Sequence, residues 1–419
     1  MVAGPLGEMN QDRLVALLKF GEVGSRAGFV VLTSYSLTLA EAGLFGLLVT
    51  LQGLASFAYG YERHTDIQRR VVGQSDVEFD LTVIRAAKLW GVNYLLVSPL
   101  YLGLLWVLGG GDLWLLGLAL VIAVAEQLMN MAYQLSLVNK RYFVLMAIAV
   151  AKNAGILLTV LWAIFLSGNT LSLELVLTAW AGWSVAATLI AGVLWIKRLQ
   201  ADHIPPADLV AQYRASGVHF LLGLVAILTL QVDRLVIGAA MPLDQVGVYF
   251  RHVLLVSMIY QVFNILFYNR ILPRVFTRVK TDPLGLARGI VSREYRRVLI
   301  FVAGVLLLGV LIHLGTAGAF ADRFALVPAY FAALLLVTIV RMRADYNALL
   351  FNALHLEKTI FKLQLISFLT ALPVLVGLTY WIGIPGTIFA GFCGALIYFT
   401  LTHHALRKFP DDWSFDHDK

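Results

Sequence analysis

Long apolar stretches separated by short polar connections repeat along most of this 419-residue chain. A helix needs about 20 residues to cross roughly 30 Å of hydrocarbon. Twelve of the stretches are about that long, and each predicts a transmembrane helix. In chain order the predicted spans are 14–38, 42–60, 86–109, 113–137, 143–167, 172–196, 216–240, 244–268, 298–317, 325–350, 358–382 and 384–404.

The composition supports this interpretation. The chain is 60% hydrophobic and 14% charged, with a mean hydropathy of +0.81, whereas soluble proteins contain roughly 25% charged residues. Its apolar surface far exceeds what one aqueous core can bury. We therefore predict an all-α integral membrane protein of about twelve transmembrane helices, with little mass left for domains outside the membrane.

Basic residues are distributed unevenly between the two sides of the predicted bundle. Of the 32 Lys and Arg residues, 22 lie in segments on one side, while the opposite connections hold only Arg323. Because Lys and Arg are enriched in cytoplasmic connections, both termini are predicted to be cytoplasmic. The net charge of +7 then lies against anionic lipid headgroups and does not indicate nucleic-acid binding. Residues 269–297 hold eight of these basic residues and are a candidate surface helix.

A proline pair near the midpoint divides the spans into two sets of six. Pro205-Pro206 resists helix continuation. A weak repeat, 39–45 and 243–249, occurs at two corresponding outer turns; two related halves are a known transporter plan, and chance similarity is the alternative. The predicted organisation is a six-helix lobe (1–196), a cytoplasmic linker (197–215), a second six-helix lobe (216–404) and a cytoplasmic tail (405–419).

Three charged residues share one face of the first span. Lys19, Glu22 and Arg26 are spaced i, i+3 and i+7, which places them along one side of a helix. A charge at mid-membrane costs about 2.5–3.5 kcal/mol even on a lenient insertion scale. The stripe therefore faces a watery cavity, which we favour, or contains a Glu22–Arg26 pair that joins helices.

Further charges lie inside other spans. Arg251, in the eighth span, has no acidic residue within four positions, so it faces a cavity or extends to the outer interface. Glu126 and Lys152, in the fourth and fifth spans, either pair with each other or act separately as a coupling acid and a substrate-binding cation.

The tenth span contains two arginines and one acid. Arg341 and Asp345 are spaced i, i+4 and are predicted to pair, which leaves Arg343 without a neutralising neighbour. Cations exceed acids among the intramembrane residues as a whole. Since Arg suits bidentate binding of phosphate oxygens, the inventory predicts an anionic cargo.

Several motifs that would indicate other functions are missing. The sequence has no P-loop, and its histidines lack the spacing of a metal site. Cys393 is the only cysteine, which excludes an intramolecular disulfide. We therefore predict a transporter rather than an enzyme, with no cofactor and no bound metal.

Short passages resemble a known family. Residues 230–238 (Leu-Gln-Val-Asp-Arg-Leu-Val-Ile-Gly) and 246–249 (Val-Gly-Val-Tyr) resemble a paired passage of Wzx-type polysaccharide flippases. These belong to the multidrug/oligosaccharidyl-lipid/polysaccharide (MOP) exporter superfamily. Residues 42–45 (Ala-Gly-Leu-Phe) resemble the family's N-terminal passage, and Leu272-Pro273 an apolar-Pro pair after the eighth span.

The resemblance implies that the protein flips undecaprenyl-diphosphate-linked oligosaccharide, the repeat unit of O-antigen or lipopolysaccharide, to the outer leaflet of the bacterial inner membrane. It implies two lobes around a cationic cavity with alternating access. Arg26 and Arg251 would meet the diphosphate or acidic sugars, with Lys152, Lys19 and Arg343 as further cavity cations. Glu126 and Glu22 would be candidates for proton or sodium coupling, although an acid in the first span is less typical of the family. A polysaccharide polymerase and a chain-length regulator are candidate partners.

Two alternative functions stay open. A MATE-like drug or metabolite exporter would share the fold, but such proteins favour cationic cargo and acidic cavities. A membrane O-antigen polymerase or ligase would bring a large outer loop, and no predicted outer connection approaches that size.

Overall fold

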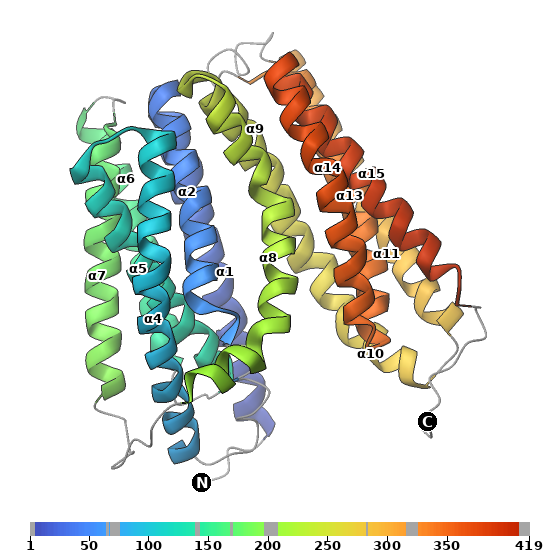
Figure 1. Ribbon diagram of the computed structural model, residues 1–419, viewed down its shortest axis with the longest axis horizontal. Coiled ribbons are helices and arrows are strands. Elements are labelled where there is room, and N and C mark those ends of the chain that lie inside the picture. Colours follow the sequence, from blue (N-terminus) through green and yellow to red (C-terminus); the bar gives the residue numbers. More distant parts are fainter. Residues whose placement is uncertain are drawn as a thin grey trace. The chain divides into compact units, whose positions relative to one another are not determined.

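The computed structural model describes residues 5–63, 67, 76–138, 143–167, 171–196, 208–281, 284–315 and 326–409. Within these ranges the chain forms helices and short turns, without a strand (Figure 1). The helices are α1 (Pro5–Ser36), α2 (Leu39–Gly60), α4 (Asp76–Gly109), α5 (Leu113–Val138), α6 (Phe143–Ser167), α7 (Leu173–Ile196), α8 (Leu209–Ala240), α9 (Leu243–Phe263), the π-helix η2 (Asn264–Tyr268), α10 (Asn269–Thr281), α11 (Leu284–Gly315), α13 (Pro328–Ala353), α14 (Glu357–Ile382) and α15 (Ile384–Leu406).

Each predicted span coincides with a helix in the part of the chain that the structure describes. Nine of these helices, α2, α4, α5, α6, α7, α8, α9, α14 and α15, are long and apolar enough to cross a membrane. The protein is therefore a multi-pass membrane protein. Helices α1, α11 and α13 also lie over predicted spans but are not among these nine. Membrane crossing by these three, and with it the count of twelve, stays a prediction, as does the cytoplasmic location of the termini.

Large apolar side chains are exposed along the spans. Phe165 of α6 is 91% exposed, Trp381 of α14 is 81% exposed and Leu95 of α4 is 78% exposed. Soluble monomers rarely leave such contiguous apolar surface open to water. Contact with lipid tails accounts for these faces, in agreement with a helical membrane protein.

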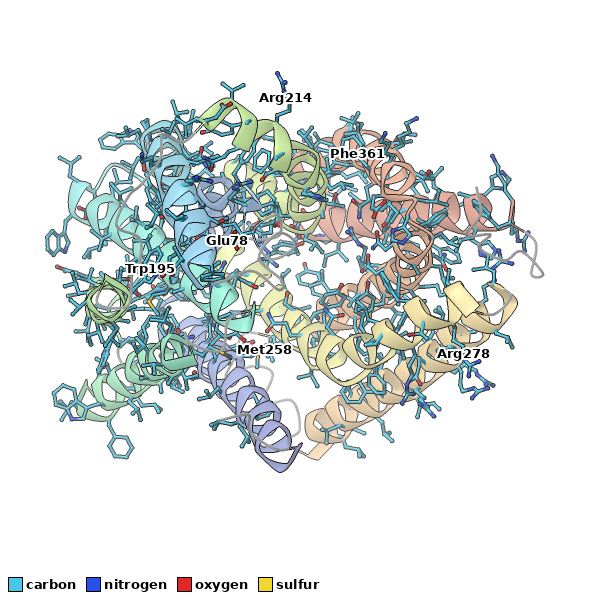
Figure 2. The ribbon with its side chains drawn as sticks, turned by 90° about the horizontal axis from the view of Figure 1, so that it is seen from below. Glu78, Trp195, Arg214, Met258, Arg278 and Phe361 are labelled. Carbon is cyan, nitrogen blue, oxygen red and sulfur yellow. The ribbon has the colours of Figure 1, made fainter. Side chains whose placement is uncertain are left out.

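Several helices begin earlier than predicted, and the added turns contain charged residues. Helix α4 starts at Asp76 rather than near residue 86, and α8 starts at Leu209 within the predicted linker; residues 197–207 of that linker lie outside the described ranges. Glu78 and Arg214 lie in these added turns and are exposed (Figure 2). Hydropathy marks only the apolar part of a helix, so polar extensions that continue it are missed.

The chain divides into two compact units, Met1–Leu228 and Thr229–Lys419. The division falls inside α8, whose first part packs with the N-terminal helices. There the rings of Tyr61 and Phe220 stack with their centroids 4.2 Å apart, and Arg63 Nη1 donates a hydrogen bond to Ser216 Oγ over 3.4 Å. The two-lobe organisation with its predicted boundaries stays a prediction.

In the N-terminal unit, α1 packs against α6, α5 against α7, and α2 against α4 and α5. Rings of Phe29, Phe45 and Trp180, from α1, α2 and α7, meet edge to face with centroids 5.3 to 6.2 Å apart. A capping box starts α2, because Thr38 Oγ1 accepts the Glu41 N–H while the Glu41 carboxylate accepts the Thr38 N–H. Such reciprocal bonds satisfy donors that the first helical turn leaves unpaired.

In the C-terminal unit, α15 packs against α13 and α14, while α9, α10 and α11 contact α13. Helix α10 is amphipathic: Ile271, Val275 and Val279 recur every four residues and are buried, whereas Arg274 and Arg278 are exposed. The candidate surface helix within 269–297 is therefore a real amphipathic helix. Its position on the membrane surface stays a prediction.

Candidate functional site

A buried ion pair joins the fourth and fifth predicted spans. Lys152 Nζ of α6 lies 2.5 Å from Glu126 Oε1 of α5, and the two residues are only 4% and 5% exposed. Of the two alternatives predicted for Glu126 and Lys152, the structure shows that they pair with each other. Whether the pair also takes part in coupling or in substrate binding stays a prediction.

Two further donors from α7 complete the surroundings of Glu126. Trp180 Nε1–H donates to Glu126 Oε1 over 2.8 Å and Ser184 Oγ donates over 2.9 Å. We call Glu126, Lys152, Trp180 and Ser184 the Glu126 cluster. A buried ion pair is tolerated when added hydrogen bonds compensate for its lost hydration. Trp180 and Ser184 were missed from the sequence, although their i, i+4 spacing places both on one face of α7.

The charged stripe on α1 lies beside this cluster. Glu22 Oε1 accepts a hydrogen bond from Asn153 Nδ2 over 3.4 Å, and Asn153 is the neighbour of Lys152 on α6. Arg26 is exposed and lies close enough to Glu126 and Lys152 to act on both electrostatically. No ion pair between Arg26 and Glu22 occurs among the described side chains. The side chain of Lys19 lies outside the described part of the structure.

Arg251 of α9 is only 6% exposed, so its side chain is buried rather than on an open surface. Its neighbour His252 is also fully buried. His252 Nδ1 lies 2.6 Å from Val248 O, and its Nε2 accepts the Val327 N–H over 2.8 Å. The second bond satisfies a backbone donor at the start of α13, so this histidine joins α9 to α13 as a neutral imidazole.

The residues that carry the family resemblance contact one another. Tyr249 Oη of α9 donates to Asp233 Oδ2 of α8 over 2.5 Å. This bond connects the two parts of the passage, 230–238 and 246–249, across the turn between the helices. The structure therefore supports a structural role for this acid and this phenol.

The predicted pair in the tenth span is confirmed. Arg341 Nε lies 3.5 Å from Asp345 Oδ1, and Asp345 Oδ2 also accepts a hydrogen bond from Tyr260 Oη over 3.0 Å. Arg341 lies over the ring of Tyr398, 5.2 Å from its centroid. Arg343 has an aromatic neighbour instead of an acid, because its guanidinium lies 5.3 Å from the ring centroid of Tyr295.

Uncharged polar side chains form a second buried network in the N-terminal unit. Tyr94 Oη donates to Gln127 Oε1, Tyr59 Oη and Ser98 Oγ share a hydrogen bond of 2.9 Å, and Asn93 Oδ1 accepts from Tyr213 over 2.6 Å. Burial raises the pKa of Tyr213, which lies before the apolar part of α8, so its phenol stays neutral at physiological pH. Sequence reasoning weighed only charges and missed this network.

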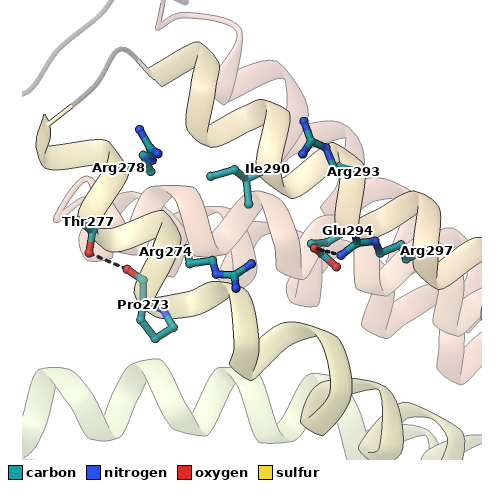
Figure 3. Close-up of a pocket in the computed structure, with 8 residues that line it drawn as sticks. All are labelled: Pro273, Arg274, Thr277, Arg278, Ile290, Arg293, Glu294 and Arg297. Carbon is teal, nitrogen blue, oxygen red and sulfur yellow. Dashed lines mark hydrogen bonds and ion pairs between the residues drawn. The ribbon is translucent and has the colours of Figure 1, made fainter.

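A cavity of about 560 Å³ between α10 and α11 is lined by arginines of both helices (Figure 3). It lies in the basic segment 269–297. No group of three or more potential metal-ligating side chains occurs among the described residues.

No protein-family model matches the chain, and no curated protein matches it. Solved structures do. The lipid II flippase MurJ in an inward closed conformation has a TM-score of 0.71 at 13% identity, covering 94% of this chain and 88% of that chain. An inward-facing multidrug resistance MATE family transporter of the MOP superfamily has a TM-score of 0.66 at 15% identity, covering 93% and 94%.

An outward-facing MATE family transporter of the same superfamily has a TM-score of 0.59 at 13% identity, covering 94% of this chain and 95% of that chain. The chain therefore has the fold of MATE and MurJ proteins, and the predicted MATE/MOP-like fold class is confirmed to that extent. Membership of the Wzx-type family stays a prediction.

Proposed function

We propose that this protein is a flippase that moves undecaprenyl-diphosphate-linked oligosaccharide from the inner to the outer leaflet of a bacterial inner membrane, without enzymatic chemistry. The fold shared with a lipid II flippase and the passages that resemble Wzx-type flippases support the proposal. O-antigen or another surface polysaccharide is the expected destination of the cargo. A polymerase and a chain-length regulator would act after the transfer.

The exposed Arg26 is the observation that carries this proposal. It lies in the middle of the first predicted span, where an uncompensated charge is costly. The neighbouring charges are already engaged, because Glu22 accepts from Asn153 and Lys152 pairs with Glu126. Arg26 is thus the described cation of this group that is exposed and has no acid paired with it, which suits binding of a diphosphate.

The other charged residues take supporting roles in the proposal. Arg251 and Arg343 add positive charge in the C-terminal unit, and Lys19 adds it on α1. The Glu126 cluster is the proposed coupling element, since release of Lys152 by protonation of Glu126 would change the charge next to Arg26. Glu22 is the second candidate for coupling to a proton or sodium ion.

A MATE-like drug or metabolite exporter is the second candidate, and it is favoured by the similarity to two MATE structures with TM-scores of 0.66 and 0.59. The two functions differ in the charge of the cargo. A deletion strain that becomes sensitive to cationic drugs while its surface glycan stays normal would support the exporter and contradict the flippase.

The decisive test measures lipid-linked oligosaccharides by mass spectrometry in a deletion strain, together with their accessibility to a membrane-impermeant sugar-oxidising reagent. Intact units should accumulate on the inner leaflet and be cleared by the wild-type protein. Arg26→Glu should reduce clearance by about 10- to 100-fold, the effect of losing a charged hydrogen bond of roughly 1.5–3 kcal/mol. Arg26→Lys should retain part of the activity.

Arg214→Glu is the matched control, because it reverses the charge of an exposed arginine of the same unit outside the predicted spans. It should clear the pool as the wild type does. An unchanged lipid-linked pool in the deletion strain would rule out the proposed cargo. Equal activity of Arg26→Glu and Arg214→Glu would rule out the role of Arg26.

A further inference from the structure

The cavity between α10 and α11 has a strong excess of positive charge. Arg274 and Arg278 contribute from α10, and Arg293 and Arg297 contribute from α11. Both pairs are spaced i, i+4, so each pair lies on one helical face, and Figure 3 shows the two faces around the same space. Four arginine side chains therefore line a cavity of about 560 Å³.

One acid lines the cavity, and it is already engaged. Glu294 Oε1 lies 2.5 Å from Arg297 Nη1, and the Glu294 side chain is buried. Glu294 is therefore occupied by Arg297, and neither Arg274 nor Arg293 has an acid partner among the described residues. All four arginines are exposed, so an anion from outside the protein can reach them.

Apolar packing holds the two arginine faces together. Ile271, Val275 and Val279 of α10 are buried, and Ala287 and Val291 of α11 are buried as well; the two helices pack against each other. Like charges on neighbouring faces are destabilising. The fold therefore maintains a site whose repulsion a bound anion would relieve.

The position of the cavity along α11 indicates the source of that anion. Arg297 is followed directly by residues 298–315, which contain no Asp, Glu, Lys or Arg. The arginines thus lie where the helix changes from polar to apolar, the level at which lipid headgroups meet hydrocarbon. Ile290 adds an apolar side chain to the lining.

We propose that the α10–α11 arginine cavity binds the phosphate diester headgroup of an anionic phospholipid. Arg forks can hold its non-bridging oxygens in bidentate hydrogen bonds, and the adjacent apolar surface of α11 receives the glycerol and the upper acyl chains. The site is independent of the transported cargo, since it needs neither the Glu126 cluster nor Arg26. Its role is to fix the α10–α11 segment against an anionic leaflet.

Native mass spectrometry of the full-length protein, purified in neutral detergent, tests the proposal. The probes are phosphatidylglycerol, phosphatidylcholine, inorganic phosphate and the water-soluble headgroup glycerophosphoglycerol. The variant is Arg274→Gln/Arg293→Gln. The control is Arg214→Gln/Arg296→Gln, which removes the same charge from exposed arginines that do not line the cavity. Thermal unfolding of each protein without lipid checks that the variants are folded.

The wild type and the control should retain phosphatidylglycerol in preference to phosphatidylcholine. The cavity variant should bind phosphatidylglycerol at least about tenfold more weakly, as expected from losing two cations at an anionic surface, and wild-type binding should weaken with salt. Equal binding of phosphatidylglycerol by the cavity variant and the control would show that the cavity is not the lipid site. Retention of inorganic phosphate or glycerophosphoglycerol as tight as that of phosphatidylglycerol would overturn the lipid source and indicate a soluble phosphate ligand.

Discussion

The Glu126 cluster and the α10–α11 arginine cavity place the same kinds of side chain in opposite circumstances. In the cluster, Lys152 and Glu126 are 4% and 5% exposed and neutralise each other. In the cavity, the four arginines are exposed, and the acid in the lining, Glu294, pairs with Arg297. A buried charge needs a partner in the protein, whereas an exposed charge is stabilised by water and stays accessible to a ligand. Substitutions in the two regions should therefore have very different effects on stability.

Glu126→Ala should have the largest effect, because it leaves the buried Lys152 ammonium without its counter-ion. Removing one partner of a buried pair typically costs about 3–5 kcal/mol, and denaturant unfolding of the purified protein in detergent would measure it. The double variant Glu126→Gln/Lys152→Met, which removes both charges, should recover much of the loss. A loss below about 1 kcal/mol for Glu126→Ala would show that the pair is not desolvated as the structure implies.

Ser184→Ala should have a smaller effect on the same cluster. It removes one hydrogen bond to a carboxylate, and bonds to charged groups contribute about 1.5–3 kcal/mol. Ser367→Ala is the matched control, since buried Ser367 donates to a neutral acceptor, the carbonyl oxygen of Gly394, over 3.2 Å. That variant should lose only about 0.5–1.5 kcal/mol. The reverse order in unfolding experiments would show that Glu126 does not rely on Ser184.

Asp345→Asn tests an intermediate case. The side chains of Arg341 and Asp345 are 13% and 22% exposed, so their pair is less desolvated than that of Lys152 and Glu126. The Asn side chain can still accept the hydrogen bond from Tyr260. We expect a loss of about 1 kcal/mol in the free energy of unfolding. A loss as large as that of Glu126→Ala would mean that the two pairs are equally buried in the membrane.

Arg274→Gln/Arg293→Gln should have the smallest effect on the protein without lipid. Exposed substitutions away from a structural contact usually change stability by less than about 0.5 kcal/mol, and relief of repulsion acts in the stabilising direction. Thermal unfolding in neutral detergent measures this. Added phosphatidylglycerol should raise the melting temperature of the wild type more than that of the variant. A large loss without lipid would show that these arginines are structural.

Charge patterns within one helix were predictable from the sequence. The Arg341–Asp345 pair follows from i, i+4 spacing, and the amphipathic character of α10 follows from apolar residues that recur every four positions. The neighbours of Arg343 were not predictable in this way. Its guanidinium lies over Tyr295 of α11, and no rule of spacing connects two residues so far apart in the chain.

The first predicted span illustrates the same limit. Spacing correctly placed Glu22 and Arg26 on one side of a helix, and it left open whether they pair or face a cavity. The structure shows Glu22 turned to Asn153 and Arg26 exposed. The choice depends on α6, which α1 contacts only after folding.

The sequence by itself determined that this is a helical membrane protein and where most of its helices lie. The physical reason is local: in hydrocarbon a backbone must satisfy its hydrogen bonds within its own segment, so hydropathy over about 20 residues decides the outcome. Only the tertiary structure decided that Lys152, Trp180 and Ser184 meet at Glu126, and that the arginines of α10 and α11 share one cavity. Helices that are apolar on nearly every side have no single buried face in their sequence, so their rotation and depth are decided by packing against neighbours.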